Sequence, residues 1–250
     1  MIKLKDLSCP PELTEEVAQA LTDEFKTTGN SVWKKDYIAE QLMTMSNGKC
    51  CFSECKLSEE GKYAEVEHFH PKSLYPDEVV KWENLLPINN AVNKAKSAHD
   101  TKLEPIINPR FDNPKKHLAF KTFRFKGKDE IGRKTIEVLN LNDTRLWVDK
   151  RYEIGNEAVE TLEDISQELQ EYDRLEVKTT RKRNNILRKL RNLFYEGTPE
   201  AEYSAVVASY LLNDDDYIII REILVKYSLW DEEFEKLEKQ LEFCALDVIS

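Results

Sequence analysis

The sequence predicts an α+β protein that is mostly helical, and three observations support this fold class. Apolar residues recur at helical spacing near the start of the chain and again over its second half. Between these regions, residues 106–140 show the alternation and the glycines typical of short strands. Residues 47–105 differ from both patterns because cysteine, histidine and asparagine concentrate there. We therefore divide the chain into segments 1–46, 47–105, 106–155 and 156–250.

The first segment is expected to form two helices. Pro11 precedes an acidic turn, and apolar residues then recur at helical spacing as far as Phe25. A second helix is expected from about residue 34 to 45, because Tyr37, Ile38, Leu42 and Met45 would share one face. Asn47 and Gly48 should end it.

Segment 106–155 is expected to add short strands. The run 118–125 alternates imperfectly between apolar and other residues, and Gly127 and Gly132 punctuate the chain after it. Residues 135–139 are the next strand candidate.

The last segment, 156–250, is expected to be helical, with apolar residues spaced three and four apart. These seam residues are Leu162, Ile165, Leu169, Tyr172, Leu187, Leu190 and Phe194. Two or three further helices should follow, the last over residues 231–246. The sequence leaves open whether these helices form the chain's own core or dock against a partner.

Charge is unevenly distributed along this helical region. The chain has 37 basic and 47 acidic residues, which gives a formal net charge of −10. Residues 157–173 carry seven acids and no base, whereas residues 178–191 carry seven bases and no acid. The basic run is either a solvated helix face or a surface that binds a nucleic-acid backbone. The negative total argues against non-specific binding by the whole protein, so binding would need a local basic surface or a partner.

Composition excludes several classes of protein. No apolar stretch approaches the roughly 20 residues needed to cross a bilayer, and charges stand where a signal peptide is apolar. Five cysteines, an odd number, indicate reduced thiols. We therefore expect a cytoplasmic protein without membrane contact. The sequence contains neither a P-loop nor a dinucleotide fingerprint, so another chain would have to bind any ATP.

The residues that can carry chemistry lie in segment 47–105. Glu67 offers a hard oxygen ligand beside His68, an imidazole that takes a proton near neutral pH. Both can serve one site if a strand ends there, as Pro71 suggests. The amide carbonyl of Asn93, in a helix beginning near residue 89 or 90, could complete a divalent-metal site. Lys94 and Lys96 would then flank a bound phosphate. Taken singly, such a histidine is often structural, and such an asparagine is often a helix cap.

The order Glu67-His68, Asn84-Leu-Leu86 and Asn93-x-x-Lys96 resembles that of the HNH nucleases, which have the ββα-metal fold. Four longer motifs extend the resemblance: Glu67–Ser73, Trp82–Leu86, Ile107–Pro109 and Thr135–Asn142. They resemble the HNH nuclease subunit of the Septu anti-phage system, which accompanies certain retrons and works beside an ABC-type ATPase. The resemblance covers about residues 30–155.

The resemblance implies a ββα-metal unit within residues 47–105, embedded between the N-terminal helices and the helical C-terminal region. It implies that His68 is the general base and that Glu67 and Asn93 hold Mg²⁺ or Mn²⁺. Asn84 would brace the loop that carries His68. Contact with substrate phosphate is expected for three further residues, His70, Lys72 and Lys96.

The chain departs from the family at its zinc knuckle, which in many relatives has two C-x-x-C pairs. Here the first pair reads Cys50-x-x-Ser53, and the second would fall at Asn89 and Val92. Cys51 and Cys55 are spaced more loosely and could recruit His70 or His99. The alternative is that they are free buried cysteines, and we expect no structural zinc.

The leading hypothesis is a metal-dependent nuclease that hydrolyses nucleic-acid phosphodiesters to leave a 5′-phosphate. DNA is the preferred substrate on the HNH resemblance, while RNA, including tRNA, stays open. The implied partner is an ABC-type ATPase of a defence complex. Two alternatives remain, namely a partner-binding subunit with an inactive nuclease unit and a stand-alone restriction-type nuclease.

Overall fold

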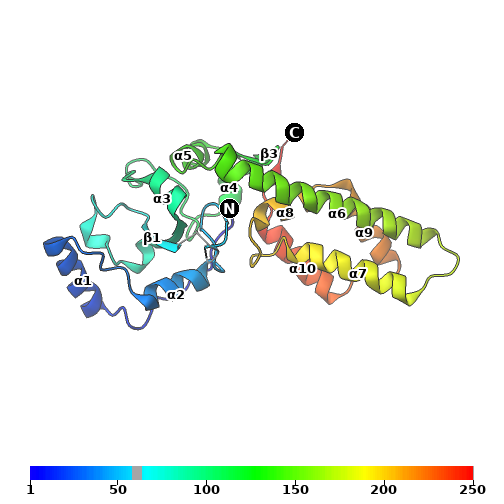
Figure 1. Cartoon of the computed structure of the whole chain (residues 1–250), viewed down its shortest axis with the longest axis horizontal. Helices are drawn as coiled ribbons and strands as arrows, with labels where there is room; N and C mark the ends of the chain where they lie inside the picture. Colours follow the sequence, from blue (N-terminus) through cyan, green and yellow to red (C-terminus); the bar gives the residue numbers. More distant parts are fainter. Residues whose placement is uncertain (58–63, 250) are drawn as a thin grey trace. The chain divides into compact units, whose positions relative to one another are not determined.

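The computed structural model describes residues 1–57 and 64–249, which fold into two compact units (Figure 1). The first unit contains most of residues 1–117 together with 126–142. The second contains most of residues 118–125 and 143–249. Helices predominate and strands are short, so the α+β fold class is confirmed.

Two helices open the first unit, as expected. Helix α1 (Glu15–Thr28) begins after Thr14, which is its N-cap and accepts a hydrogen bond from the backbone of Val17. It ends at Gly29, whose φ of 72° is a left-handed conformation that glycine adopts without strain. Helix α2 (Asp36–Met45) buries the predicted apolar face.

A strand–strand–helix arrangement follows in the same unit. Strand β1 (Ala64–His68) pairs antiparallel with β2 (Leu85–Asn89), with His68 opposite Leu85. Every residue of β2 is buried. Asn89 then caps helix α3 (Asn90–Lys96) by accepting a hydrogen bond from Ala91 at 2.8 Å, so the expected start of this helix is confirmed. Two short 3₁₀ turns, η1 (Pro76–Glu78) and η2 (Trp82–Asn84), lie between the strands.

The strand expected over residues 135–139 is wrong, because they belong to helix α5 (Glu130–Val138) and its C-cap. Asp129 is its N-cap and accepts from the backbone of Gly132 at 2.8 Å. The Thr135 hydroxyl donates to the Ile131 carbonyl one turn earlier and accepts from the backbone of Ile107. Local capping thus outweighs the β-branched composition of this stretch. A one-turn helix, α4 (Pro114–His117), precedes it.

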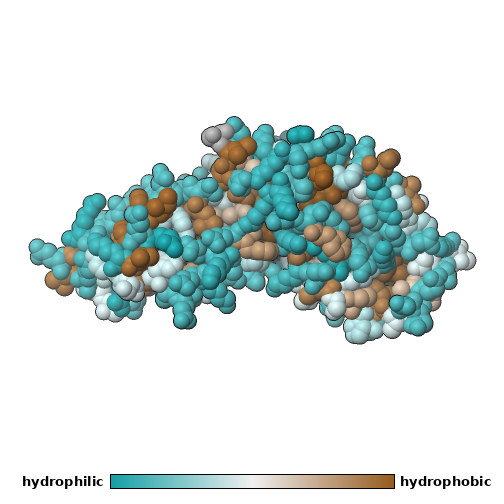
Figure 2. Space-filling view, turned by 180° about the vertical axis from the view of Figure 1, so that it is seen from behind, coloured by the Kyte–Doolittle hydropathy of each residue, from teal (hydrophilic) through white to brown (hydrophobic). Residues whose placement is uncertain are grey.

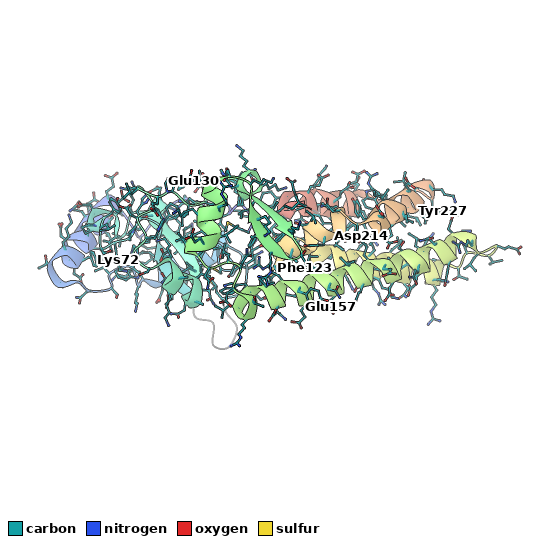
Figure 3. The ribbon with its side chains drawn as sticks, turned by 90° about the horizontal axis from the view of Figure 1, so that it is seen from above. Lys72, Phe123, Glu130, Glu157, Asp214 and Tyr227 are labelled. Carbon is teal, nitrogen blue, oxygen red and sulfur yellow. The ribbon has the colours of Figure 1, made fainter. Side chains whose placement is uncertain are left out.

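The second unit contains a small sheet. Strands β3 (Leu118–Lys121) and β4 (Arg124–Gly127) confirm the expected strands, and β5 (Asp247–Val248) pairs parallel with β3. The tip of the β3–β4 hairpin is Thr122 and Phe123, with φ of 48° and 59°. Phe123, labelled in Figure 3, stacks on Tyr210 with ring centroids 4.2 Å apart, which helps to hold this turn.

The rest of the second unit is helical. Helix α6 packs against α7, α8 and α9, and α10 packs against α7 and α8 (Figure 1). All seven seam residues are buried inside this unit. They pack in the chain's own core, which is one of the two roles that the sequence left open for these helices. The boundary placed between residues 155 and 156 falls within α6. The elements are the π-helical turn η3 (Thr144–Val148), α6 (Asp149–Arg174), α7 (Thr180–Tyr195), α8 (Ser204–Leu212), α9 (Asp215–Lys226) and α10 (Glu232–Cys244).

Across residues 1–57 and 64–249, no helix combines the length and the hydrophobicity that crossing a membrane requires. On the face shown in Figure 2, hydrophilic residues predominate and hydrophobic ones form small separate groups.

Candidate active site

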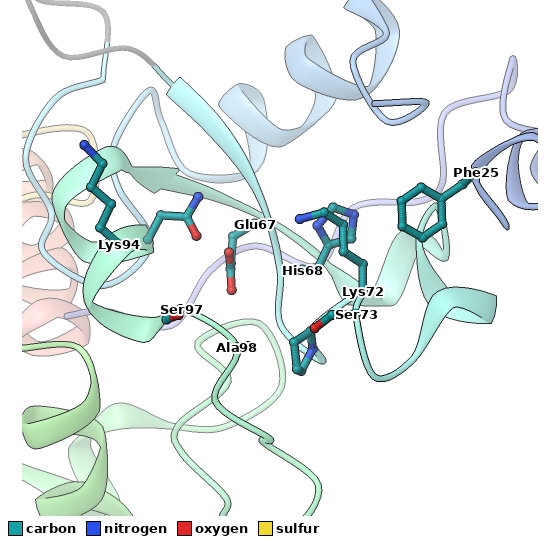
Figure 4. Close-up of a pocket in the computed structure, with 10 residues that line it drawn as sticks. Phe25, Glu67, His68, Lys72, Ser73, Lys94, Ser97 and Ala98 are labelled. Carbon is teal, nitrogen blue, oxygen red and sulfur yellow. The ribbon is translucent and has the colours of Figure 1, made fainter. Parts of the chain in front are cut away.

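Five of the residues that the sequence singled out line one hollow of the first unit, with a volume of about 440 Å³. Glu67 and His68 reach it from the end of β1, Lys72 from the turn that follows, and Asn93 and Lys94 from α3. Figure 4 shows the Glu67 carboxylate and the His68 ring at this hollow, with Lys72 beside the ring. Because β1 ends at His68, two consecutive residues can serve the same site.

The ring of His68 is fixed from two directions. Its Nε2 lies 2.8 Å from the carbonyl oxygen of Val79, and the Trp33 ring meets it edge-on, with centroids 4.7 Å apart. A carbonyl only accepts, so Nε2 carries the hydrogen and the lone pair of the neutral ring is on Nδ1. Burial, reinforced by the ammonium of Lys72, lowers the pKa of His68 to about 3. The ring is therefore neutral at physiological pH.

Glu67 is a buried carboxylate with an incomplete set of partners. Its Oε1 lies 2.5 Å from Nζ of Lys96, yet accepts no well-aligned hydrogen bond within the described residues. Burial raises the pKa of the Glu67 carboxyl, against the opposing effect of Lys96. Desolvation of this group is thus only partly compensated by the chain itself.

Asn93 is oriented by Glu65, a residue that sequence reasoning missed. The Asn93 Nδ2 donates to one oxygen of the Glu65 carboxylate at 2.6 Å, and Nδ2 of Asn90 donates to the other at 2.5 Å. The Glu65 carboxylate accepts from the NH₂ group of Asn93, so the carbonyl oxygen of Asn93 is left available to other partners. Glu65 and Glu67 are two residues apart on β1 and so share one face of the strand, which was the signal available in the sequence.

Asn84 does not line the hollow. Its Oδ1 accepts from the backbone of His70 at 2.7 Å, and its Nδ2 donates to the carbonyls of His70 and Glu78, each at 3.1 Å. The side chain is buried. These contacts join the segment after His68 to the segment before Val79, whose carbonyl holds the His68 ring.

Lys72 links the hollow to a second one of about 620 Å³, which Asn93 also lines. Its Nζ lies 4.8 Å from the centre of the Trp33 ring, a cation–π contact. Lys34 and Lys35, from the loop before α2, line the second hollow as well. Sequence reasoning singled out neither Trp33 nor these two lysines.

His70 and Lys96 line neither of the two hollows. Nδ1 of His70 is 2.7 Å from the hydroxyl of Thr101, which itself donates to a backbone carbonyl. The Lys96 side chain is 0% exposed, and its Nζ donates to the carbonyl of His68 in addition to pairing with Glu67. The expected position of Lys96 beside a phosphate is therefore wrong, because its ammonium points into the protein.

The sequence offered Cys51 and Cys55 as zinc ligands, with His70 or His99 as further ligands. Cys50, Cys51 and Cys55 are buried and are not joined in disulfides. His70 is bound to Thr101, and Nε2 of His99 lies 2.8 Å from the carbonyl of Glu104. Within the described ranges, no three histidine, cysteine, aspartate or glutamate side chains are grouped so that they could hold a metal ion.

A divalent ion with oxygen ligands is a different case, because asparagine can contribute. The carboxylate of Glu67 and the amide oxygen of Asn93 are hard donors of the kind that Mg²⁺ and Mn²⁺ take. Both side chains line the same hollow, and the buried Glu67 Oε1 lacks a well-aligned donor among the described residues. These residues fit such an ion.

Comparison with known proteins identifies the family. The chain is 44% identical over 237 residues to the Septu protein PtuB of Bacillus thuringiensis, an alignment that covers 95% of this chain and 92% of the relative. The chain belongs to the Septu PtuB family. The alignment extends well beyond residues 30–155, where the motifs lie, so both units share the PtuB relationship. No family model and no solved structure matches this PtuB-family chain.

Proposed function

We propose that this PtuB-family protein is a metal-dependent HNH endonuclease of a Septu-like anti-phage defence complex. The observation that carries the proposal is the meeting of His68, Glu67 and Asn93 in one hollow at the end of a strand–strand–helix unit. The order of the elements matches the ββα-metal fold that the sequence motifs imply.

Glu67 and Asn93 would hold Mg²⁺ or Mn²⁺. When bound, the ion supplies positive charge that stabilises the charge developing on the phosphate and on the leaving oxygen. Glu65 keeps the Asn93 amide turned in one direction through the hydrogen bond to its NH₂ group.

His68 acts as the general base through Nδ1. It takes a proton from water as the water oxygen bonds to phosphorus and the bond from phosphorus to the 3′-oxygen breaks. The leaving 3′-oxygen takes a proton from solvent water, so the products are a 5′-phosphate and a 3′-hydroxyl. The hydrogen bond from Nε2 to the Val79 carbonyl then stabilises the positive charge on the ring.

Lys72, Lys34 and Lys35 supply positive charge beside the reacting phosphate, since they line the adjoining hollow. Their contacts would be to the backbone of the nucleic acid and carry no sequence information. We propose DNA as the substrate on the HNH resemblance. RNA, including tRNA, meets the same chemical requirement and belongs in the same assay.

We also propose that the protein acts in the cytoplasm beside an ABC-type ATPase. The chain has no P-loop of its own, so ATP-dependent control of the nuclease would come from that second subunit.

The decisive experiment measures cleavage of plasmid DNA and total tRNA with Mg²⁺, Mn²⁺ or EDTA, with and without the ATPase. We expect metal-dependent cleavage, and a loss of at least about 100-fold in His68→Ala, since a general base contributes roughly 10²–10⁴ in rate. His99→Ala is the matched control, because His99 lies outside both hollows.

A catalytically inactive, partner-binding subunit is the second candidate. The observation that favours it is the Lys96 ammonium, which already neutralises Glu67. A stable complex with the ATPase, together with no cleavage in any metal, would establish this reading and contradict the nuclease.

A further inference from the structure

Helix α7 of the second unit has two different faces. Its apolar face is buried and contains Ile186, Leu190 and Phe194. Along the other face, Arg181, Asn185 and Arg188 are exposed and follow one another at intervals of four and three residues. Residues at this spacing lie on one side of a helix, so the two arginines are two turns apart, about 10 Å along the axis.

The charge on this helix is only partly neutralised by the chain. Lys182 and Lys189 pair with Glu171 and Glu168 of α6, which runs alongside α7 (Figure 1). Arg191 pairs with Asp231 and Glu233 near the start of α10.

The remaining arginines of α7 are Arg181, Arg183 and Arg188. In the described part of the chain, none of the three forms an ion pair with a carboxylate. Arg183 and Arg188 instead donate to the amide oxygens of Asn184 and Asn185. Positive charge therefore accumulates on the edge of α7 that carries Arg181 and Arg188.

That edge is hollowed. A groove of about 650 Å³ is lined by six residues, all polar, and contains no aliphatic or aromatic side chain. The lining residues are Thr179, Arg181, Lys182, Asn184, Asn185 and Arg188. Guanidinium, ammonium, amide and hydroxyl groups are the donors that proteins use against phosphate and sugar oxygens.

We propose that this α7 groove binds the phosphate backbone of the nucleic acid that the protein cleaves. The inference rests on the proposed function, because it assigns the groove to the same substrate. The net charge of −10 means that only a local basic surface can provide such binding. A docking site for a protein is disfavoured, because the centre of a protein interface is usually apolar and aromatic, and this groove is neither.

The test measures binding without cleavage. Full-length protein carrying His68→Ala is titrated in EDTA against a fluorescein-labelled duplex of about 30 base pairs, over roughly 50–200 mM salt. We compare Arg181→Gln/Arg188→Gln with Lys236→Gln/Lys239→Gln. The latter pair removes the same charge from the exposed face of α10, where neither lysine forms an ion pair in the described chain.

We expect the arginine pair to reduce affinity at least about 10-fold at 100 mM salt. The slope of log K against log salt should also become less steep by about 1.8, the loss of two phosphate contacts. The affinity and the salt slope of the lysine control should stay close to those of the His68→Ala protein. Arg181→Lys/Arg188→Lys, which keeps the charge, should retain most of the slope, and circular dichroism checks that each variant is folded.

Equal effects of the arginine and lysine pairs would overturn the inference, as would normal DNA affinity combined with lost binding to the ATPase. The two proposals fail separately. Cleavage by the wild type with unaltered binding of the arginine variant contradicts only the groove. Impaired binding of that variant, together with an inactive wild type, supports the groove and contradicts only the nuclease.

Discussion

Asn84 connects two backbone segments that the pocket needs. It holds residue 70, just after the predicted base, and residue 78, just before the carbonyl that orients that base. The buried Asn84 amide makes three hydrogen bonds to the backbone, so removing it would leave backbone groups without partners in the interior. The role that the sequence motif implied for Asn84, bracing the loop, agrees with these contacts.

We therefore expect Asn84→Ala to lower the free energy of unfolding by about 2–3 kcal/mol. It should also lower any cleavage activity, because Val79 would no longer be held in place beside His68. Urea denaturation followed by tryptophan fluorescence measures the first effect. Asn192→Ala, an exposed asparagine on α7, is the control and should be close to neutral. Equal stability of the two variants would contradict the bracing role.

Sequence reasoning located Glu67, His68 and Asn93 because each belongs to a short motif with fixed chemistry. It could not locate Trp33, since the contact between Trp33 and His68 joins distant parts of the chain. It misplaced Lys96 for a related reason. A lysine on a short helix is usually solvated, and only the tertiary structure shows that its ammonium pairs with Glu67.

At the scale of elements, one carboxylate ties the end of α6 to the end of α9. Lys226 donates to both oxygens of Asp173, at 2.9 and 3.1 Å, and the hydroxyl of Tyr227 donates to Oδ1. Tyr227 is labelled in Figure 3. The hydrogen bonds from Lys226 and Tyr227 lower the pKa of Asp173 from its ordinary value.

Because the pKa of Asp173 is lower in the folded protein, these contacts stabilise the fold at pH values above the ordinary aspartate pKa. The stabilisation is lost as the pH falls through the lowered pKa. Asp173→Asn should therefore reduce the melting temperature at pH 7, and the difference from wild type should shrink below about pH 4. Thermal unfolding at several pH values checks this. Asp164→Asn, on the exposed face of α6, should show neither effect. If the melting temperature of Asp173→Asn stayed below that of wild type at low pH, the stabilising role of the Asp173 carboxylate would be contradicted.

The elements differed in how well the sequence predicted them. The α6 and α7 seams are long and strictly periodic, so both helices could be anticipated. Helix α5 could not, because its Asp129 cap and the contact of Thr135 with Ile107 outweigh a strand-like composition. Strand β5 has two residues and shows no alternation, and only its pairing with β3 defines it.

At the scale of the whole molecule, charge is unevenly distributed. An excess of acids gives the net charge of −10, yet lysines outnumber acids around the second hollow of the first unit, and the residues that line the α7 groove include bases and no acid. The acids of α6 neutralise one edge of α7 and leave the other positive. The alignment with PtuB covers both units, so the family shares the second unit as well as the unit that contains the pocket.

The Lys96–Glu67 pair has a consequence for how the pocket should be handled in the laboratory. The ammonium of Lys96 lies beside the carboxylate and also donates to the carbonyl of His68. Lys96 therefore offsets part of the buried negative charge without any added ion, and the shape of the site is built into the fold. Metal-stripped protein should accordingly keep its melting temperature, which differential scanning calorimetry can measure. A chelator would then act on this protein as a reversible inhibitor and not as a denaturant.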